Sequence, residues 1–182
     1  MVDAMSGTKS KSAVHVGLNR QALADREAQV AARVGELHEV DFNAMTAISN
    51  LFRVSSAVRN HMERDVLGPD GLSWTGFTAL FVLWVWGAQD AKRLAEECGV
   101  AKGTLTGVAT TLEAKGLLSR SNHPEDGRLV LISLTSRGRS TIKRLFPKFN
   151  QHEGLVTSVL TAKEQVQLAG LLRKVLRNVE AL

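Results

Sequence analysis

The spacing of apolar positions along the first half of the chain predicts a mainly helical protein. Apolar residues recur every three or four positions over 19–37 and again over 41–66, which indicates two amphipathic helices. The segment 68–71 contains two glycines and a proline and interrupts this pattern. A third helix over 73–86 is apolar on nearly all sides, so we expect it to be buried on most of them.

A different pattern follows in the middle of the chain. Two short helices are predicted over 91–98 and 102–115, and each is followed by a glycine, the residue that most easily ends a helix in left-handed backbone. The segments 117–120 and 129–134 have the length and composition of strands. The turn between them, 123–127, contains a proline and an Asp-Gly pair, so we expect a β-hairpin.

Two more helices complete the expected fold. Thr135 or Ser136 can cap a long helix, and Thr161 with Glu164 has the spacing of a capping box at the start of the last one. One face of the last helix is apolar and carries Leu168, Leu172, Val175, Val179 and Leu182. Such a stripe requires a partner surface, in the same chain or in a second one.

Charge is concentrated in one part of the chain. The formal net charge is +5, and residues 91–144 contain ten Lys or Arg against five acids, whereas the remainder holds thirteen of each sign. A neutral scaffold with one basic segment is typical of a polyanion binder, because each phosphate contact releases condensed counterions. A solubilising surface would have the same composition, and charge alone leaves both interpretations open.

The predicted helix 102–115 has two unlike sides. Leu105, Val108 and Leu112 form the apolar side. The residues left to face outward are Lys102, Gly103, Thr104, Thr106, Gly107, Thr110 and Thr111. A solvated surface helix is the alternative, but such a face more often uses Glu, Lys or Ala, since Thr and Gly are poor helix formers. The pattern therefore favours a recognition helix in a DNA major groove, with hydroxyls for bases or phosphates.

Two helices followed by a basic hairpin are the sequence form of a winged helix-turn-helix. The segments 91–106, 112–117, 126–128 and 134–138, in this order and spacing, resemble the MarR family of winged helix-turn-helix transcriptional regulators. The order of helices matches that family over roughly residues 41–180. The expected fold class is thus mainly α with a small β-hairpin wing.

The resemblance implies a winged helix-turn-helix lobe inside a helical dimerisation region that is built from both ends of the chain. The expected domains are a flexible tail over 1–18, N-terminal dimerisation helices over 19–70, a DNA-binding lobe over 71–138 and C-terminal dimerisation helices over 139–182. The tail is also expected from its composition, which is rich in Ser, Gly and Lys without sustained periodicity.

The hairpin carries further candidate DNA-binding residues. By resemblance, Asp126 and Arg128 match the wing-tip acid and arginine of the family, where the arginine enters the minor groove and the acid helps to hold the wing. Arg120 and His123 lie on the same hairpin and complete the DNA-binding set.

Two positions depart from the family pattern. Ala101 replaces the Ser or Thr that typically caps the recognition helix, so the cap must come from water or a neighbour. Glu125 replaces an arginine that often precedes the wing aspartate, which removes a cation from the wing tip.

Aromatic and cationic residues gather on the helices predicted over 41–66 and 73–86. Most aromatic side chains at helical spacing belong to the core, and this interpretation stays open. The resemblance, however, implies a crevice for phenolic or anionic small molecules in this region. The candidate ligand-binding residues are Phe52, Arg53, Arg59, His61, Trp74 and Phe77.

Other chemistry finds little support. Cys98 occupies an expected apolar position, so we interpret it as a small core residue rather than a redox switch. The five histidines lack zinc-ligand spacing, and no nucleophile or phosphate-loop motif is present. We expect no enzymatic activity, no cofactor and no metal. Without a secretory signal or an apolar segment of membrane-spanning length, the expected location is the cytoplasm, with no membrane partner.

Together these features predict a sequence-specific transcriptional regulator that binds double-stranded DNA. We expect a homodimeric repressor on a pseudo-palindromic operator, released by a small aromatic or anionic ligand. The alternative is an architectural DNA-binding protein that responds to no ligand and binds mainly through phosphates.

Overall fold

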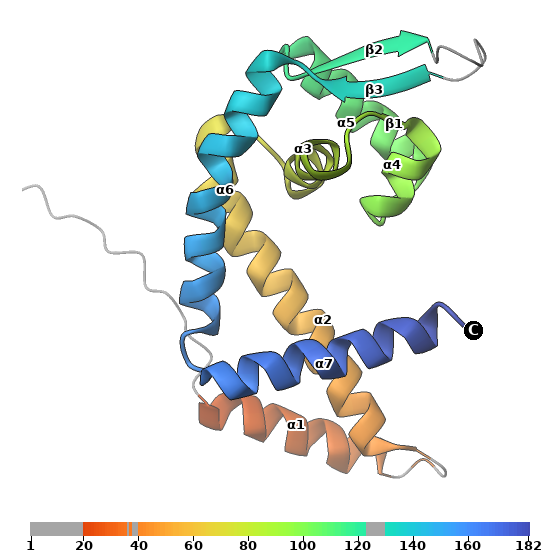
Figure 1. The fold of residues 1–182 in the computed structure, drawn as a ribbon. Coiled ribbons are helices and arrows are strands. Elements are labelled where there is room, and N and C mark those ends of the chain that lie inside the picture. Colours follow the sequence, from red (N-terminus) through yellow and green to blue (C-terminus); the bar gives the residue numbers. More distant parts are fainter. Residues whose placement is uncertain (1–19, 36, 38–39, 123–129) are drawn as a thin grey trace, which may run out of the picture. The chain divides into compact units, whose positions relative to one another are not determined.

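The chain forms two compact units in the computed structural model, Met1–Arg53 and Val54–Leu182 (Figure 1). The structure describes residues 20–35, 37, 40–122 and 130–182. The predicted tail, 1–18, lies outside the described residues.

The first unit contains α1 (Arg20–Val34) and the start of α2 (Phe42–Met62). Asp41 caps α2, since its Oδ1 accepts a hydrogen bond from the Ala44 amide at 2.9 Å. The Asn50 side-chain amide donates to Glu27 Oε1 at 2.9 Å and joins the two helices. Both predicted helices are confirmed over the described residues.

The second unit continues from the end of α2. In chain order it contains a π turn, η1 (Glu63–Leu67), a 3-10 turn, η2 (Gly68–Asp70), α3 (Trp74–Trp86), β1 (Gln89–Asp90), α4 (Ala91–Glu97), α5 (Lys102–Ala114), β2 (Leu118–Asn122), β3 (Val130–Leu134), α6 (Ser136–Thr157) and α7 (Ala162–Val179). Among the described residues, no single helix is both long and apolar enough to cross a membrane.

The helix predicted over 41–66 changes its winding before it ends. Its α-helical part stops at Met62, and the amide of Gly68 donates to the carbonyl of Glu63, five residues back. Pro69 has no amide hydrogen and cannot continue the α-helical ladder. Gly71, at φ 61°, then turns the chain into α3. Apolar spacing alone could not reveal this π turn, since it alters the winding locally.

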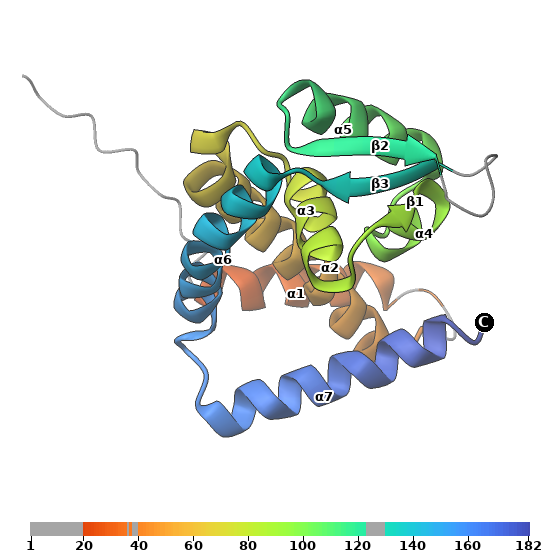
Figure 2. The same cartoon turned by 45° about the horizontal axis from the view of Figure 1, so that its top comes forward.

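Helix α3 forms the centre of the core. The Ser73 hydroxyl caps it by accepting from the Gly76 amide at 3.1 Å. Phe77, Leu80 and Leu83 are buried, and α3 contacts α4, α5, α6 and β3 (Figure 2). The prediction that this helix would be buried on most sides is confirmed.

The strands form one antiparallel sheet in the order β1-β3-β2. Arg120 and Gln89 both pair with Ile132, from opposite sides of β3. The two predicted strands of the hairpin are confirmed. The tip of the hairpin, 123–129, lies outside the described residues. Sequence patterning missed β1, because a strand of two residues is too short to show alternation.

Both C-terminal helices begin at the predicted caps. Thr135 Oγ1 accepts from the Gly138 amide at 3.0 Å at the start of α6. Thr161 and Glu164 form the predicted capping box at the start of α7. Within the part of the chain that the structure describes, no residue of α7 is buried, so its apolar stripe is exposed there.

Candidate nucleic-acid interface

Helix α4, the first helix of the helix-turn-helix, is capped at its N-terminus by Asp90. Asp90 Oδ1 accepts from the amides of Lys92 and Arg93 at 2.8 and 3.0 Å. The hydrogen bond from the Arg93 amide is the main cause that holds the pKa of the Asp90 carboxyl below its usual value. Leu94 and Ala95 bury the inner side of α4, and Gly99, at φ 63°, turns the chain toward α5. The cap and the glycine together set where the second helix can begin.

Helix α5 shows the two sides that its sequence predicts. Leu105 and Leu112 are buried, Val108 packs partly buried against the core, and Ala109 is buried as well. All seven residues predicted to face outward are exposed: Lys102, Gly103, Thr104, Thr106, Gly107, Thr110 and Thr111. A Cβ at either glycine of this set would meet no atom within 4 Å. The outer side of α5 is therefore open along its length.

Threonine hydroxyls on this face are already engaged as donors. Thr106 and Thr110 donate to the carbonyls of Lys102 and Thr106, both at 2.9 Å, and Thr111 donates to that of Gly107 at 3.0 Å. A hydroxyl that donates its hydrogen to a carbonyl of its own helix can still accept a hydrogen bond through its oxygen. In this conformation Thr106 and Thr111 present acceptor oxygens to a groove, whereas the Thr110 oxygen already accepts from Arg120 Nη2.

The departure at Ala101 has a structural counterpart. Ala101 stands at the N-cap of α5, and no side chain there accepts a hydrogen bond from the first turn. The first amides of α5 therefore lack the internal partner that a Ser or Thr would supply.

Arg120 joins the wing to α5. Its Nη1 lies 3.3 Å from Glu113 Oε2, and its Nη2 donates to Thr110 Oγ1 at 3.1 Å. Arg120 thus braces β2 against α5, a role that the sequence did not indicate. The other predicted wing residues, His123, Asp126 and Arg128, lie outside the described residues.

An aromatic cavity lies between α3 and α6 in the second unit. It has a volume of about 200 Å³ and is lined by Trp74, Phe77, Thr78, Phe81, Phe146, Phe149 and Glu153. The rings of Phe77 and Phe149 stack with centroids 4.2 Å apart. Trp74 and Phe77 were predicted ligand residues, whereas the α6 residues were missed because they lie about seventy positions further along the chain.

The other predicted ligand residues fall into different surroundings. The Arg59 guanidinium lies 6.0 Å from the ring centroid of Trp74, within cation–π range. His61 contacts Asp65 at 2.7 Å through Nδ1 and His152 at 3.0 Å through Nε2. Phe52 and Arg53 belong to the first unit. The structure therefore brings Arg59, Trp74 and Phe77 together.

The single cysteine packs partly buried against the core at the end of α4. Burial, with a smaller contribution from the charge of Glu97, raises the pKa of the Cys98 thiol to about 11. Since the thiolate is the reactive form, this environment suppresses thiol chemistry.

Two short helices, an exposed polar second helix and an antiparallel wing define a winged helix-turn-helix protein. The family model described as "MarR family" matches residues 72–130. An HTH-type transcriptional regulator of Bacillus subtilis, YwaE, is 38% identical over 143 residues, which cover 79% of this chain and 84% of YwaE. The chain belongs to the MarR family of DNA-binding transcriptional regulators, and the predicted family and fold class are confirmed.

Solved structures agree with this assignment. Bordetella bronchiseptica BpsR, whose DNA binding is described as regulated by 6-hydroxynicotinic acid, is 27% identical with a TM-score of 0.65, over 70% of this chain and 90% of BpsR. AbsC, a MarR family regulator of Streptomyces coelicolor, has a TM-score of 0.71 at 19% identity, over 80% of this chain and 100% of AbsC. Because AbsC is only 19% identical to this chain, its similarity supports the fold alone.

Proposed function

We propose that this chain is a homodimeric repressor that reads a pseudo-palindromic operator. The observation that carries the proposal is the outer side of α5, where seven exposed residues include hydroxyls, glycines and a lysine but no acid. Such a face can approach a major groove closely without repelling phosphates. The site of action would be the cytoplasm, where the operator lies.

The exposed apolar stripe of α7 supports the dimer. Four residues of this stripe, Leu168, Leu172, Val175 and Val179, and Leu182 just beyond the end of α7 are between 39% and 100% exposed in the described structure. Covering them with a second copy would remove apolar surface from water at about 25 cal/mol per Å². In this arrangement 19–70 and 139–182 form the dimerisation region around the lobe 71–138, and the two recognition helices stand about 34–36 Å apart, one turn of DNA.

In the proposed complex α5 lies in the major groove. The Thr106 and Thr111 oxygens accept hydrogen bonds from the exocyclic amines of adenine or cytosine, because their hydrogens are donated to carbonyls of α5 itself. Arg128 enters the adjacent minor groove, with Asp126 holding the wing and His123 beside it. Arg120 acts mainly by holding the wing against α5.

A small aromatic or anionic ligand would release the operator. The cavity between α3 and α6 is lined mainly by aromatic rings, with Glu153 in its lining, and has room for a single ring. Arg59 beside Trp74 offers a positive charge for a carboxylate. The regulation of BpsR by 6-hydroxynicotinic acid supports a ligand of this class. Phe52, Arg53 and His61 remain proposed contributors.

Footprinting on the DNA upstream of the chain's own gene tests the proposal. At near-physiological salt we expect a protected pseudo-palindrome and at least ~10³-fold preference for it over random DNA. A steep salt dependence with little difference between the two DNAs would instead support an architectural protein. In the same assay, 6-hydroxynicotinic acid or 4-hydroxybenzoate should lower operator affinity, and substitution Trp74→Ala should reduce that response.

A further inference from the structure

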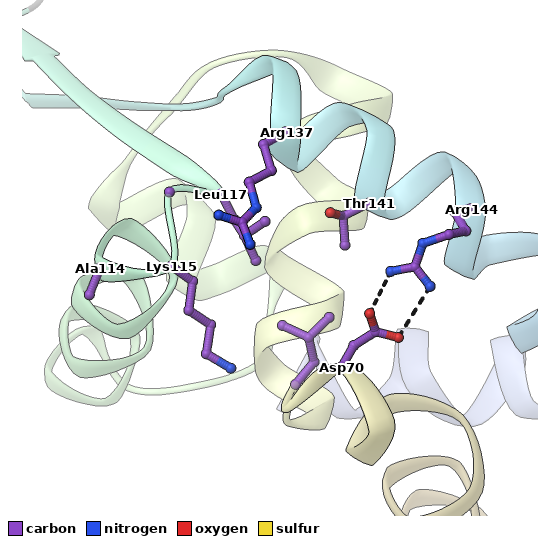
Figure 3. Close-up of a pocket in the computed structure, with 9 residues that line it drawn as sticks. Asp70, Ala114, Lys115, Leu117, Arg137, Thr141 and Arg144 are labelled. Atoms are coloured by element: carbon purple, nitrogen blue, oxygen red, sulfur yellow. Dashed lines mark hydrogen bonds and ion pairs between the residues drawn. The ribbon is translucent and has the colours of Figure 1, made fainter.

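A second cavity, distinct from the aromatic one, lies at the far end of the recognition helix (Figure 3). Its volume is about 620 Å³, and its walls come from η2, the end of α5 and the first turns of α6. Leu72 and Leu117 are buried in its wall. All of its lining belongs to the second unit, so its geometry does not depend on the first.

Three cations face this cavity against one acid. Asp70 is already paired with Arg144, whose two terminal nitrogens, Nη1 and Nη2, donate to its two carboxylate oxygens. Lys115 donates to the main-chain carbonyl of Gly71. No carboxylate among the described residues lies within ion-pair distance of Arg137, whose side chain reaches from α6 toward Leu117 and the side where Lys115 lies (Figure 3). The lining therefore has a net positive charge, and the Arg137 guanidinium has no carboxylate partner among the described residues.

We propose that this cavity binds a small oxyanion, a phosphate or carboxylate group, through Arg137 and Lys115. The planar fork of Arg137 can donate two parallel hydrogen bonds to such a group. Lys115 would exchange a neutral carbonyl for a charged oxygen, which makes a stronger hydrogen bond. The hydroxyl of Thr141, on the same wall, supplies a further donor.

The cavity suits a free small molecule rather than the backbone of the operator. It is at the C-terminal end of α5, about 20 Å along the helix from Lys102 at 1.5 Å per residue. Its volume lies in the range of small-molecule sites. The proposed ligand is therefore a free anion, and contact with DNA phosphate is an alternative outcome of the test.

The anion would connect the recognition helix to α6. Lys115 follows the last residue of α5, whereas Arg137 lies in the first turn of α6, so one ligand held by both would fix the two ends together. This regulatory consequence rests on the proposed function: occupancy of the cavity should change operator affinity. Binding of the anion to the cavity does not depend on this effect on operator affinity.

Calorimetric titration of the full chain without DNA, in buffer of low ionic strength, tests the site with inorganic phosphate and citrate as probes. We expect saturable binding that Arg137→Gln weakens at least about ten-fold, as the loss of a hydrogen bond to a charged group requires. Arg139→Gln removes an exposed cation of α6 that does not line the cavity, and should leave affinity within about two-fold. Should Arg137→Gln unfold, Lys115→Gln probes the same site.

Absence of saturable binding to the wild-type chain, or equal losses in Arg137→Gln and Arg139→Gln, overturns the proposal. The proposal is also overturned if phosphate fails to bind while Arg137→Gln lowers both operator affinity and its salt dependence. Such a result would show that these cations contact DNA phosphates. A separate gel shift with and without phosphate tests the regulatory consequence. Failure of the operator footprint would count against the proposed function and leave the titration unaffected.

Discussion

Gly138 lies so close to the main chain of Leu117 that a Cβ on Gly138 would stand 2.0 Å from the Leu117 carbonyl oxygen. The same oxygen accepts from the Thr135 amide at 3.1 Å. Thr135 in turn donates through its hydroxyl to the carbonyl of Gly116 at 2.7 Å. These contacts fix the start of α6 on the turn between α5 and β2, and only a glycine at position 138 permits them.

Gly138→Ala should destabilise the fold by about 3 kcal/mol or more, since the new methyl group must push main-chain atoms apart. Gly154 provides the matched control in the same helix, because a Cβ there meets no atom within 4 Å. Gly154→Ala should be neutral or stabilising by up to about 1 kcal/mol. Urea unfolding measures both, and equal effects would show that the close approach is not rigid.

Leu172→Gln should weaken the dimer, because it places a polar side chain within the apolar stripe of α7. We expect a shift of at least about 2 kcal/mol in the dimerisation free energy, on the scale of one buried leucine. Arg173→Gln, at the next position, is the control and should leave the dimer intact. Analytical ultracentrifugation measures both, and a wild-type monomer at micromolar concentration would contradict the proposed dimer.

Arg128→Ala should weaken operator binding by about 1.5–3 kcal/mol, the range for hydrogen bonds to charged groups. The loss should be concentrated at operators with A·T-rich flanks, whose narrow minor groove attracts arginine. Arg177→Ala is the control, because it removes one positive charge from α7, outside the expected DNA-binding lobe. If gel shifts gave the two variants equal affinity, the wing would have no specific role.

Thr106→Ala should change base preference more than salt dependence. The Thr106 oxygen is an acceptor without phosphate-binding charge, so its loss should cost about 1 kcal/mol of discrimination at one base pair. Thr157→Ala is matched, because Thr157 makes the same hydrogen bond to the carbonyl four residues back, on α6. A binding-site selection experiment compares the two variants. If Thr106→Ala changed the salt dependence of binding without changing the base preference, Thr106 would contact the DNA backbone instead.

The Cys98 thiol should react slowly with iodoacetamide in the folded protein, and the rate should rise about ten-fold per pH unit up to about pH 11. The folded pKa is raised above the usual 9.0, so the native state holds the proton more tightly. The stabilisation linked to this proton is complete below about pH 9 and is lost as pH rises toward 11.

Alkylation in urea supplies the control for Cys98, since the unfolded thiol should react at its ordinary rate. Comparing the urea midpoint of the wild type with that of Cys98→Ala between pH 8 and pH 10 isolates the linked stability from other titrating groups. Equal alkylation rates in the folded and unfolded chain would contradict the buried environment.

Features that depend on neighbours in the sequence were predictable. The caps at Thr135 and Thr161 and the two sides of α5 rest on contacts three or four residues apart, which spacing shows directly. The pairing of His61 with His152 spans 91 positions, and that of Asp70 with Arg144 spans 74. Nothing in local spacing marks such partners.

By itself, the sequence determined the helix order, the polar face of α5, the family and the concentration of basic charge, because periodicity, caps and composition are local properties. Only the tertiary structure decided that Arg120 binds Glu113 and Thr110, that Phe149 stacks on Phe77, and that Gly138 must lack a side chain. It also placed Arg137 and Lys115 at one cavity. Such juxtapositions depend on how the helices pack, and packing is set by the whole core at once.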